Sequence, residues 1–138
     1  MKSHVTPYRR FPGTARDAME FYHGIFGGDI DILNFGSMHS AEEVGDAVDK
    51  VMHSHIVIDG TPLLYAADVI GGMEITSGED TPIAITGGPD ALEEVKGYWD
   101  ALAEGGTIEM AFETAPWGAS FGSLQDKFGT HWFFNVQG

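Results

Sequence analysis

Cysteine is absent from the 138-residue sequence, and long apolar runs are absent too. Without cysteine the chain can form no disulfide, thiolate nucleophile, iron–sulfur cluster or Cys-ligated zinc site. This composition fits a cytoplasmic protein, which is the localisation that we expect. No apolar stretch approaches the roughly 18 residues of a membrane span, and the N-terminus lacks a signal-peptide core. We therefore expect no membrane partner.

Basic residues are also scarce, with 7 Lys and Arg against 21 Asp and Glu and a formal net charge of −14. A chain this acidic repels phosphate backbones, so we expect no nucleic-acid partner. A cationic ligand would be attracted by the same charge. The alternative interpretation is that the charge only keeps the protein soluble.

The first half of the chain reads as strand, helix and three strands. The strands are expected at residues 5–11, 29–35, 51–58 and 61–67, and Asp59-Gly60 is a typical two-residue hairpin turn between the last two. Apolar residues recur at helical spacing between Thr14 and Gly27-Gly28, where glycine ends the helix. Residues 36–50 are polar and predict an exposed loop with one helical turn near residues 41–44.

The second half repeats this order. Strands are expected at residues 81–86, 107–112, 122–124 and 130–136, and a helix carries Leu92, Val95, Trp99 and Leu102. Neither half buries enough apolar surface alone, so the two should share one core. The fold class is thus α+β, with two βαβββ modules in a single domain, residues 1–138. Module one covers about residues 4–68, module two about 81–137, and residues 69–80 form a Gly-rich linker.

Strand alternation sorts the polar residues onto faces. His53 and His55 share one side of their strand, while Ser54 and Ile56 share the other, which should pack on a helix. By the same rule three further sets each share a side of their own strand: Thr6, Tyr8 and Arg10; Pro62, Leu64, Ala66 and Asp68; His131, Phe133 and Asn135.

If these inner faces converge, they line one pocket for a small organic ligand. Its polar contacts would be Tyr8, Arg10, His53, His55, His131 and Asn135, on an apolar floor of Leu64, Pro82 and Phe133. A few polar groups on an apolar lining are typical of a small-molecule site. Trp117, in a Pro-Trp-Gly loop, could be a lid that stacks on the ligand. Alternatively, it plugs the end of the core or lies in a dimer interface.

The two histidines are also a possible metal pair, since residues at this spacing on a strand point the same way. A third ligand could be His131 or Asp68. The alternative is that both histidines are merely hydrogen-bonded or solvent-facing. A zinc site normally needs three protein ligands and only two are adjacent here, so we expect no metal and no cofactor.

Several blocks of residues resemble the vicinal oxygen chelate superfamily, the group of glyoxalase I, bleomycin- and fosfomycin-resistance proteins and extradiol dioxygenases. The N-terminal blocks are Thr6-Pro7-Tyr8, Phe21-Tyr22 and Phe26-Gly27-Gly28. Other stretches resemble its PhnB-like branch, above all Trp117-Gly118-Ala119-Ser120-Phe121-Gly122 and Asp126-Lys127-Phe128-Gly129-Thr130-His131-Trp132.

The resemblance implies paired βαβββ modules whose mixed sheets curl around one pocket, and a homodimer. It also implies four metal-ligand positions, which fall here on Thr6, Leu64, Pro82 and Phe133, where metal enzymes of the superfamily have His, Glu or Gln. Leu, Pro and Phe side chains cannot coordinate a divalent ion. No Gly-rich nucleotide turn follows the first strand, so nothing supports a methyl-donor site.

Our leading hypothesis is a metal-free, PhnB-like pocket protein that binds a small organic molecule, with catalysis left open. One alternative is a divalent-metal lyase or dioxygenase of the glyoxalase superfamily that uses the histidine pair. Another is a drug-sequestering protein of the bleomycin-binding type, which the acidity and Trp117 would suit.

Overall fold

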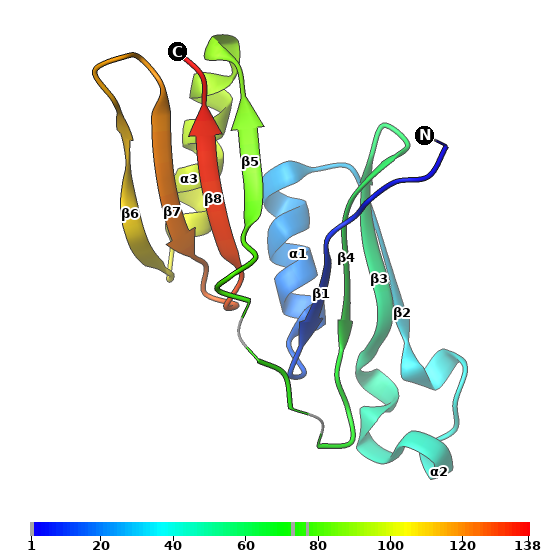
Figure 1. Ribbon diagram of the computed structural model, residues 1–138. Helices are drawn as coiled ribbons and strands as arrows, with labels where there is room; N and C mark the ends of the chain where they lie inside the picture. Colours follow the sequence, from blue (N-terminus) through cyan, green and yellow to red (C-terminus); the bar gives the residue numbers. More distant parts are fainter. Residues whose placement is uncertain (1, 73, 77) are drawn as a thin grey trace. The chain divides into compact units, whose positions relative to one another are not determined.

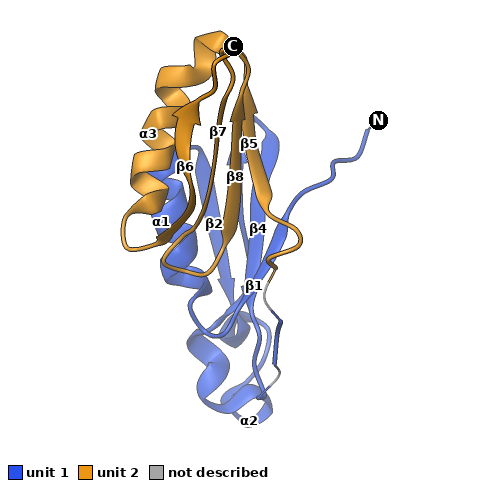
Figure 2. Cartoon of the chain, turned by 60° about the vertical axis from the view of Figure 1, so that its left-hand side comes forward, with its two compact units in different colours: residues 1–76 blue, residues 77–138 orange. Residues whose placement is uncertain are grey.

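The computed structural model describes residues 2–72, 74–76 and 78–138. The chain divides into two compact units, residues 1–76 and residues 77–138, which are coloured separately in Figure 2. Each unit contains the helices and strands of one predicted module. Among the described residues no helix is long and apolar enough to cross a membrane.

The described residues of unit 1 form four strands, one long helix and a short helical segment, whose arrangement Figure 1 shows. Its elements are β1 (Tyr8–Phe11), α1 (Ala15–Phe26), β2 (Asp29–Asn34), α2 (Ala41–Val44), β3 (Val51–Ile58) and β4 (Thr61–Asp68). The helix α2 lies where one helical turn is predicted, and short 3₁₀ turns at Phe35–Ser37 and Gly45–Asp49, which are not predicted, flank it. The first strand is shorter than predicted and begins at Tyr8.

Unit 2 repeats the βαβββ order. Its elements are β5 (Ile83–Gly87), a 3₁₀ turn (Pro89–Ala91), α3 (Leu92–Ala103), β6 (Thr107–Thr114), β7 (Ser120–Gln125) and β8 (His131–Val136). A glycine with positive φ stands at the end of the long helix in each unit. Gly27 (φ 75°) directly follows α1, and Gly105 (φ 74°) lies two residues after the end of α3.

Each unit forms one four-stranded mixed sheet, ordered β1-β4-β3-β2 in unit 1 and β5-β8-β7-β6 in unit 2. The first strand of each module pairs in parallel with its last strand, and the other neighbours are antiparallel. The predicted α+β class with two βαβββ modules is therefore confirmed, as two separate four-stranded sheets.

A single helix covers one face of each sheet (Figure 1). In unit 1, α1 buries Ala18, Met19 and Tyr22 against a strand face that includes Ile56 and Leu64. In unit 2, Trp99 of α3 stacks on Phe112 with ring centroids 5.4 Å apart and meets Phe134 edge-on at 4.9 Å. No helix among the described residues of the same unit covers the opposite face of either sheet.

The hairpin between β3 and β4 contains a bulge that shifts its register by one residue. The turn is as predicted, with positive φ at Asp59 (50°) and Gly60 (80°). Val57 pairs with Pro62, but Ile56 pairs with Leu64, so Leu63 is an extra residue on β4. Beyond the bulge every β4 side chain lies on the opposite face from the one that uninterrupted pairing would give.

Candidate functional site

Four rings gather on the face of the unit-1 sheet opposite α1, which we call the helix-free face. His53 and His55 lie on β3, Tyr8 on β1 and Tyr65 on β4. The His53 ring centroid lies 5.8 Å from that of Tyr8, 5.5 Å from that of His55 and 5.2 Å from that of Tyr65. The sequence places Tyr8, His53 and His55 together correctly, and Tyr65 completes the ring cluster.

A chain of hydrogen bonds runs through this ring cluster. The Tyr8 hydroxyl lies 3.1 Å from Nδ1 of His53, and Nε2 of His53 lies 3.5 Å from Nδ1 of His55. With both imidazoles neutral, the network is satisfied when Tyr8 donates to His53 and His53 donates to His55. Nε2 of His55 then carries a proton that a bound ligand can accept.

His53 favours its neutral form. Partial burial lowers its pKa below the ordinary 6.5, and the neighbouring His55 lowers it further, while the carboxylate of Asp31 acts in the opposite direction. A neutral imidazole can accept a proton from a ligand or share a hydrogen bond with it near neutral pH. The cluster can therefore stack on a ligand and also exchange a proton with it.

Charged side chains flank the ring cluster on the same face. Tyr8, Tyr65, His55 and Asp31 form one row across the four strands, since each is the register partner of the next. Arg10 lies two residues along β1 from Tyr8, beside Ala67. Arg10 and Asp31 are both exposed. A cation therefore stands at the β1 edge of the face and an anion at the β2 edge.

The predicted apolar floor is wrong at Leu64. Because of the bulge in the hairpin, Leu64 pairs with Ile56 on the face that α1 covers, and it is 2% exposed. Tyr65 takes the place opposite His55 instead. If residues are paired from the Asp59-Gly60 turn without a bulge, Tyr65 falls opposite Ser54 on the face that α1 covers. Nothing in the local sequence marks the extra residue that changes this pairing.

Asp68 lies on the α1 side of β4, which removes it as a third ligand for a metal on the helix-free face. Its buried carboxylate accepts the backbone N–H of Ala15 through Oδ1 (2.8 Å) and that of Val51 through Oδ2 (2.9 Å). It thereby caps the first turn of α1, where the side chain of Thr14 makes no capping bond. Asp68 is a structural residue that joins α1, β3 and β4.

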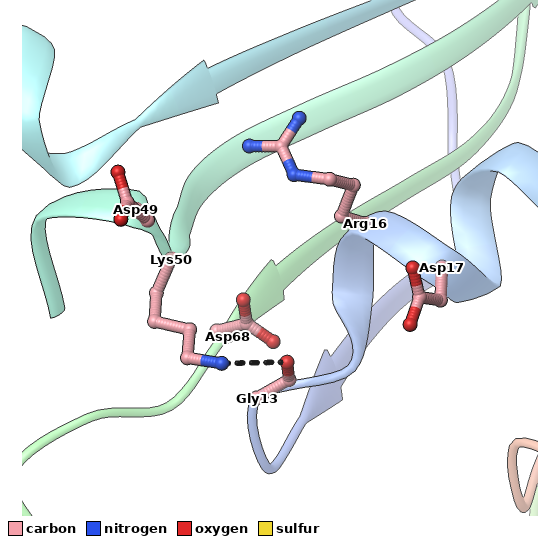
Figure 3. A pocket seen from close by; sticks show the side chains of 6 residues that line it. All are labelled: Gly13, Arg16, Asp17, Asp49, Lys50 and Asp68. Carbon is pink, nitrogen blue, oxygen red and sulfur yellow. Dashed lines mark hydrogen bonds between the residues drawn. The ribbon is translucent and has the colours of Figure 1, made fainter.

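A polar pocket of about 150 Å³ lies near this cap (Figure 3). Both of its cationic side chains are engaged within unit 1, since Arg16 donates to Asn34 and Nζ of Lys50 donates to the carbonyl of Gly13 at 3.2 Å. The carboxylate of Asp68, on the same wall, is the resident anion at the start of α1. We therefore assign this pocket a structural role, in tying α1 to the ends of the strands.

In unit 2 the predicted residues lie on the face opposite α3 or in a loop. His131 is only 6% exposed, and its Nδ1 lies 3.4 Å from a carboxylate oxygen of Glu109 on β6. Asn135 pairs with Thr86 and Phe121 across the sheet. Trp117 is 75% exposed in the β6–β7 turn and lies 6.4 Å from the Phe121 ring. It does not plug the core of unit 2.

The Asp-x-Phe-Gly motif of unit 2 stabilises the turn between β7 and β8. Asp126 accepts the backbone N–H groups of Phe128 (2.8 Å) and Thr130 (3.1 Å) through Oδ1, and the indole N–H of Trp132 through Oδ2 (2.8 Å). This bonding fixes the β7–β8 turn and anchors a buried tryptophan. Asp126, which belongs to a motif that carries much of the family resemblance, therefore has a structural role.

The four positions that the resemblance implies as metal ligands do not fit a divalent ion. Leu64 faces α1, and Phe133 lies beside Ala84 on its sheet. Thr6 and Pro82 precede the strands, and a lone threonine hydroxyl cannot hold the ion. Within residues 2–72, 74–76 and 78–138, no group of three or more His, Cys, Asp or Glu side chains could hold a metal.

Comparisons with known proteins agree on one family. A family model described as 3-demethylubiquinone-9 3-methyltransferase matches residues 3–134. Protein YjdN of Escherichia coli strain K12 is 29% identical over 142 residues, which cover 96% of this chain and 94% of YjdN.

Two solved structures share the fold along nearly the whole chain. Protein PA1353 from Pseudomonas aeruginosa is 31% identical with a TM-score of 0.82, over 99% of this chain and 98% of that one. A putative 3-demethylubiquinone-9 3-methyltransferase, PhnB protein, from Bacillus cereus is 23% identical with a TM-score of 0.75. The latter match covers 97% of this chain and 99% of that one.

Proposed function

The chain belongs to the PhnB-like family described as 3-demethylubiquinone-9 3-methyltransferase, within the vicinal oxygen chelate superfamily, and from this premise we propose that it binds a small organic molecule without a metal. The observation that carries the proposal is the ring cluster on the helix-free face of unit 1. Ring faces provide stacking area, and the Tyr8–His53–His55 chain provides directional polar contacts.

The ligand contacts that we propose in unit 1 are Tyr8, Arg10, His53 and His55, with Tyr65 added. In unit 2 we propose Trp117, His131 and Asn135. The exposure of Trp117 supports a role for its indole in stacking on a partner molecule rather than in the core of unit 2.

We do not extend the proposal to methyl transfer, although the family description names that reaction. β1 is followed by Pro12-Gly13-Thr14 and then directly by α1, so no Gly-rich nucleotide turn stands there. An acid–base reaction is compatible with His53, whose lowered pKa favours the neutral imidazole. Ligand binding is the part of the function that the geometry supports best.

The test is a ligand screen with the full chain in the presence of EDTA, read out by amide chemical shifts. The double variant His53→Ala/His55→Ala should lose binding of any hit while keeping the wild-type pattern of shifts elsewhere. His39→Ala is the matched control, because His39 belongs to the same unit, lies outside the strands of its sheet and pairs with exposed Glu43 of α2. Hits that bind the double variant unchanged would refute the site.

A divalent-metal lyase or dioxygenase is the second candidate, and one distance favours it. The 3.5 Å between Nε2 of His53 and Nδ1 of His55 is short enough for both to reach one ion at about 2.0–2.1 Å from each nitrogen. Elemental analysis of untagged protein, purified without chelators, decides between the candidates. One divalent ion per chain would replace the metal-free proposal.

We also propose that the protein is a cytoplasmic homodimer. The absence of cysteine supports the compartment, and the superfamily resemblance supports the dimer. Light scattering coupled to size-exclusion chromatography gives the mass directly, and the mass of one chain at all concentrations would contradict the dimer.

A further inference from the structure

The helix-free face of unit 1 is electrically polarised from one edge of its sheet to the other. Arg10 lies on β1, at one edge, and Asp29 and Asp31 lie on β2, at the other. Three strand-to-strand steps at about 4.8 Å each put the two edges roughly 14 Å apart. The face therefore presents a cation and two anions at opposite ends of one surface.

Both principal charges are available to a ligand. Arg10 and Asp31 are exposed, and neither takes part in a salt bridge with another residue of the described ranges. The register partner of His53 is Leu33 and not Asp31. Asp31 influences the pKa of His53 through its negative charge.

Between the charged edges, the surface is made of aromatic rings. Tyr8 and Tyr65 meet edge to face at 6.1 Å, and Tyr65 also packs against both histidines. The β4 residue next to Arg10 is Ala67, so no large β4 side chain separates the guanidinium from the imidazoles. A planar group laid across β4 and β3 would contact rings along its length.

We propose that the ligand of this face is a small organic zwitterion with a planar body, its anionic group at Arg10 and its cationic group at Asp31. This inference rests on the proposed function and names the ligand class for the same site. It follows from charge complementarity at both ends and from the rings between them.

Simpler ligands leave part of this face unmatched. An organic cation would suit the net charge of −14, but it would meet Arg10 at one end of the site. An organic anion would pair with Arg10 but would extend toward Asp29 and Asp31. The long-range field of distant acidic residues is screened over about 8 Å at physiological salt, so the local charges decide the class of ligand.

The test compares four isosteric probes on the full-length protein at pH 7.5. They are the planar zwitterion 6-(aminomethyl)-2-naphthoate, its cationic carboxamide analogue, its anionic hydroxymethyl analogue and the neutral analogue with both replacements. Binding is titrated by amide and imidazole chemical shifts. The zwitterion should bind tightest, by about threefold or more over each singly charged probe, as expected for one exposed charge pair. Shifts should centre on Tyr8, His53 and His55.

Two variants test the ends separately. Arg10→Gln should remove the advantage of the zwitterion over the cationic carboxamide, and Asp31→Asn should remove its advantage over the anionic hydroxymethyl probe. Lys96→Gln and Asp46→Asn change the net charge by the same amounts at exposed positions on other elements, α3 and the turn after α2. These controls should leave all four affinities unchanged.

Each outcome bears on a different statement. Equal affinity for the four probes, or no binding of any of them, overturns the zwitterion inference and leaves the proposed site to the ligand screen. Tightest binding by the cationic carboxamide points to a cationic ligand and also overturns the zwitterion inference. Binding of the probes with shifts confined to residues away from the ring cluster overturns the proposed function itself.

Discussion

At the scale of single residues, His53 connects the electrostatics of the site to its chemistry. Its neighbours act on its pKa in opposite directions, since proximity to His55 lowers the value and the charge of Asp31 raises it. Partial burial, the largest cause, remains in either single variant. The two neighbours can therefore be tested against one another on the same group.

We predict that His55→Asn raises the pKa of His53 and that Asp31→Asn lowers it. In the first variant the imidazolium of His53 no longer meets a second positive charge, and in the second it loses a stabilising anion. A pH titration of imidazole resonances measures both changes, with His23 of α1 as the internal reference. Shifts of the same sign in both variants would show that the neighbours do not act through their charges.

Tyr65 and Asp68 show what residue patterns alone could not give. Alternation on β3 correctly predicted that His53 and His55 share a face and that Ser54 and Ile56 share the buried one. The same rule failed on β4, because one bulged residue, Leu63, reverses the faces beyond it. Asp68 looked like a possible metal ligand, and only tertiary structure reveals the two backbone N–H groups that it accepts.

At the scale of elements, local signals worked where a helix or a turn is decided by its own residues. Gly27 ends α1 and the Asp59-Gly60 turn joins β3 to β4, as the sequence predicts. Element edges set by pairing partners were less predictable, and β1 begins three residues later than expected, at Tyr8, where pairing with Tyr65 begins. Contacts far apart in sequence fix such boundaries.

Two glycines of unit 2 provide a matched test of how α3 packs on its sheet. A Cβ at Gly122 on β7 would lie 2.8 Å from Cα of Phe112 and 2.9 Å from the Trp99 ring, whereas a Cβ at Gly97 on α3 would meet nothing within 4 Å. Gly122→Ala should therefore destabilise the protein by about 1–3 kcal/mol through overpacking. Gly97→Ala should stabilise it by about 0.5–1 kcal/mol, because alanine favours an exposed helix position.

Urea denaturation of both variants measures these changes. The pair shares a substitution, so differences in the unfolded state largely cancel in the comparison. A Gly122→Ala protein as stable as the wild type would mean that Trp99 and β6 can move apart at little cost, and that the close packing of α3 on β7 is not a constraint.

At the scale of the whole molecule, charge imbalance is the property that composition gives most directly. Acidic residues outnumber basic ones three to one, and at exposed sites such as Glu42, Glu43, Asp46 and Asp49 they lie close together in the chain. Like charges brought together by folding repel one another, so the compact state is disfavoured relative to the expanded chain.

Raising the salt concentration should therefore stabilise this protein. The screening length falls from about 30 Å at 0.01 M to about 3 Å at 1 M, which removes most repulsion between exposed carboxylates. We expect the unfolding temperature to rise as NaCl increases from 10 to about 500 mM, and KCl to act equally. The rise should be smaller in the variant Asp46→Lys/Asp49→Lys, because it removes two negative charges and adds two positive ones in the acidic segment. A salt dependence that is the same in this variant and in the wild type would mean that specific ion binding, and not net charge, governs the effect.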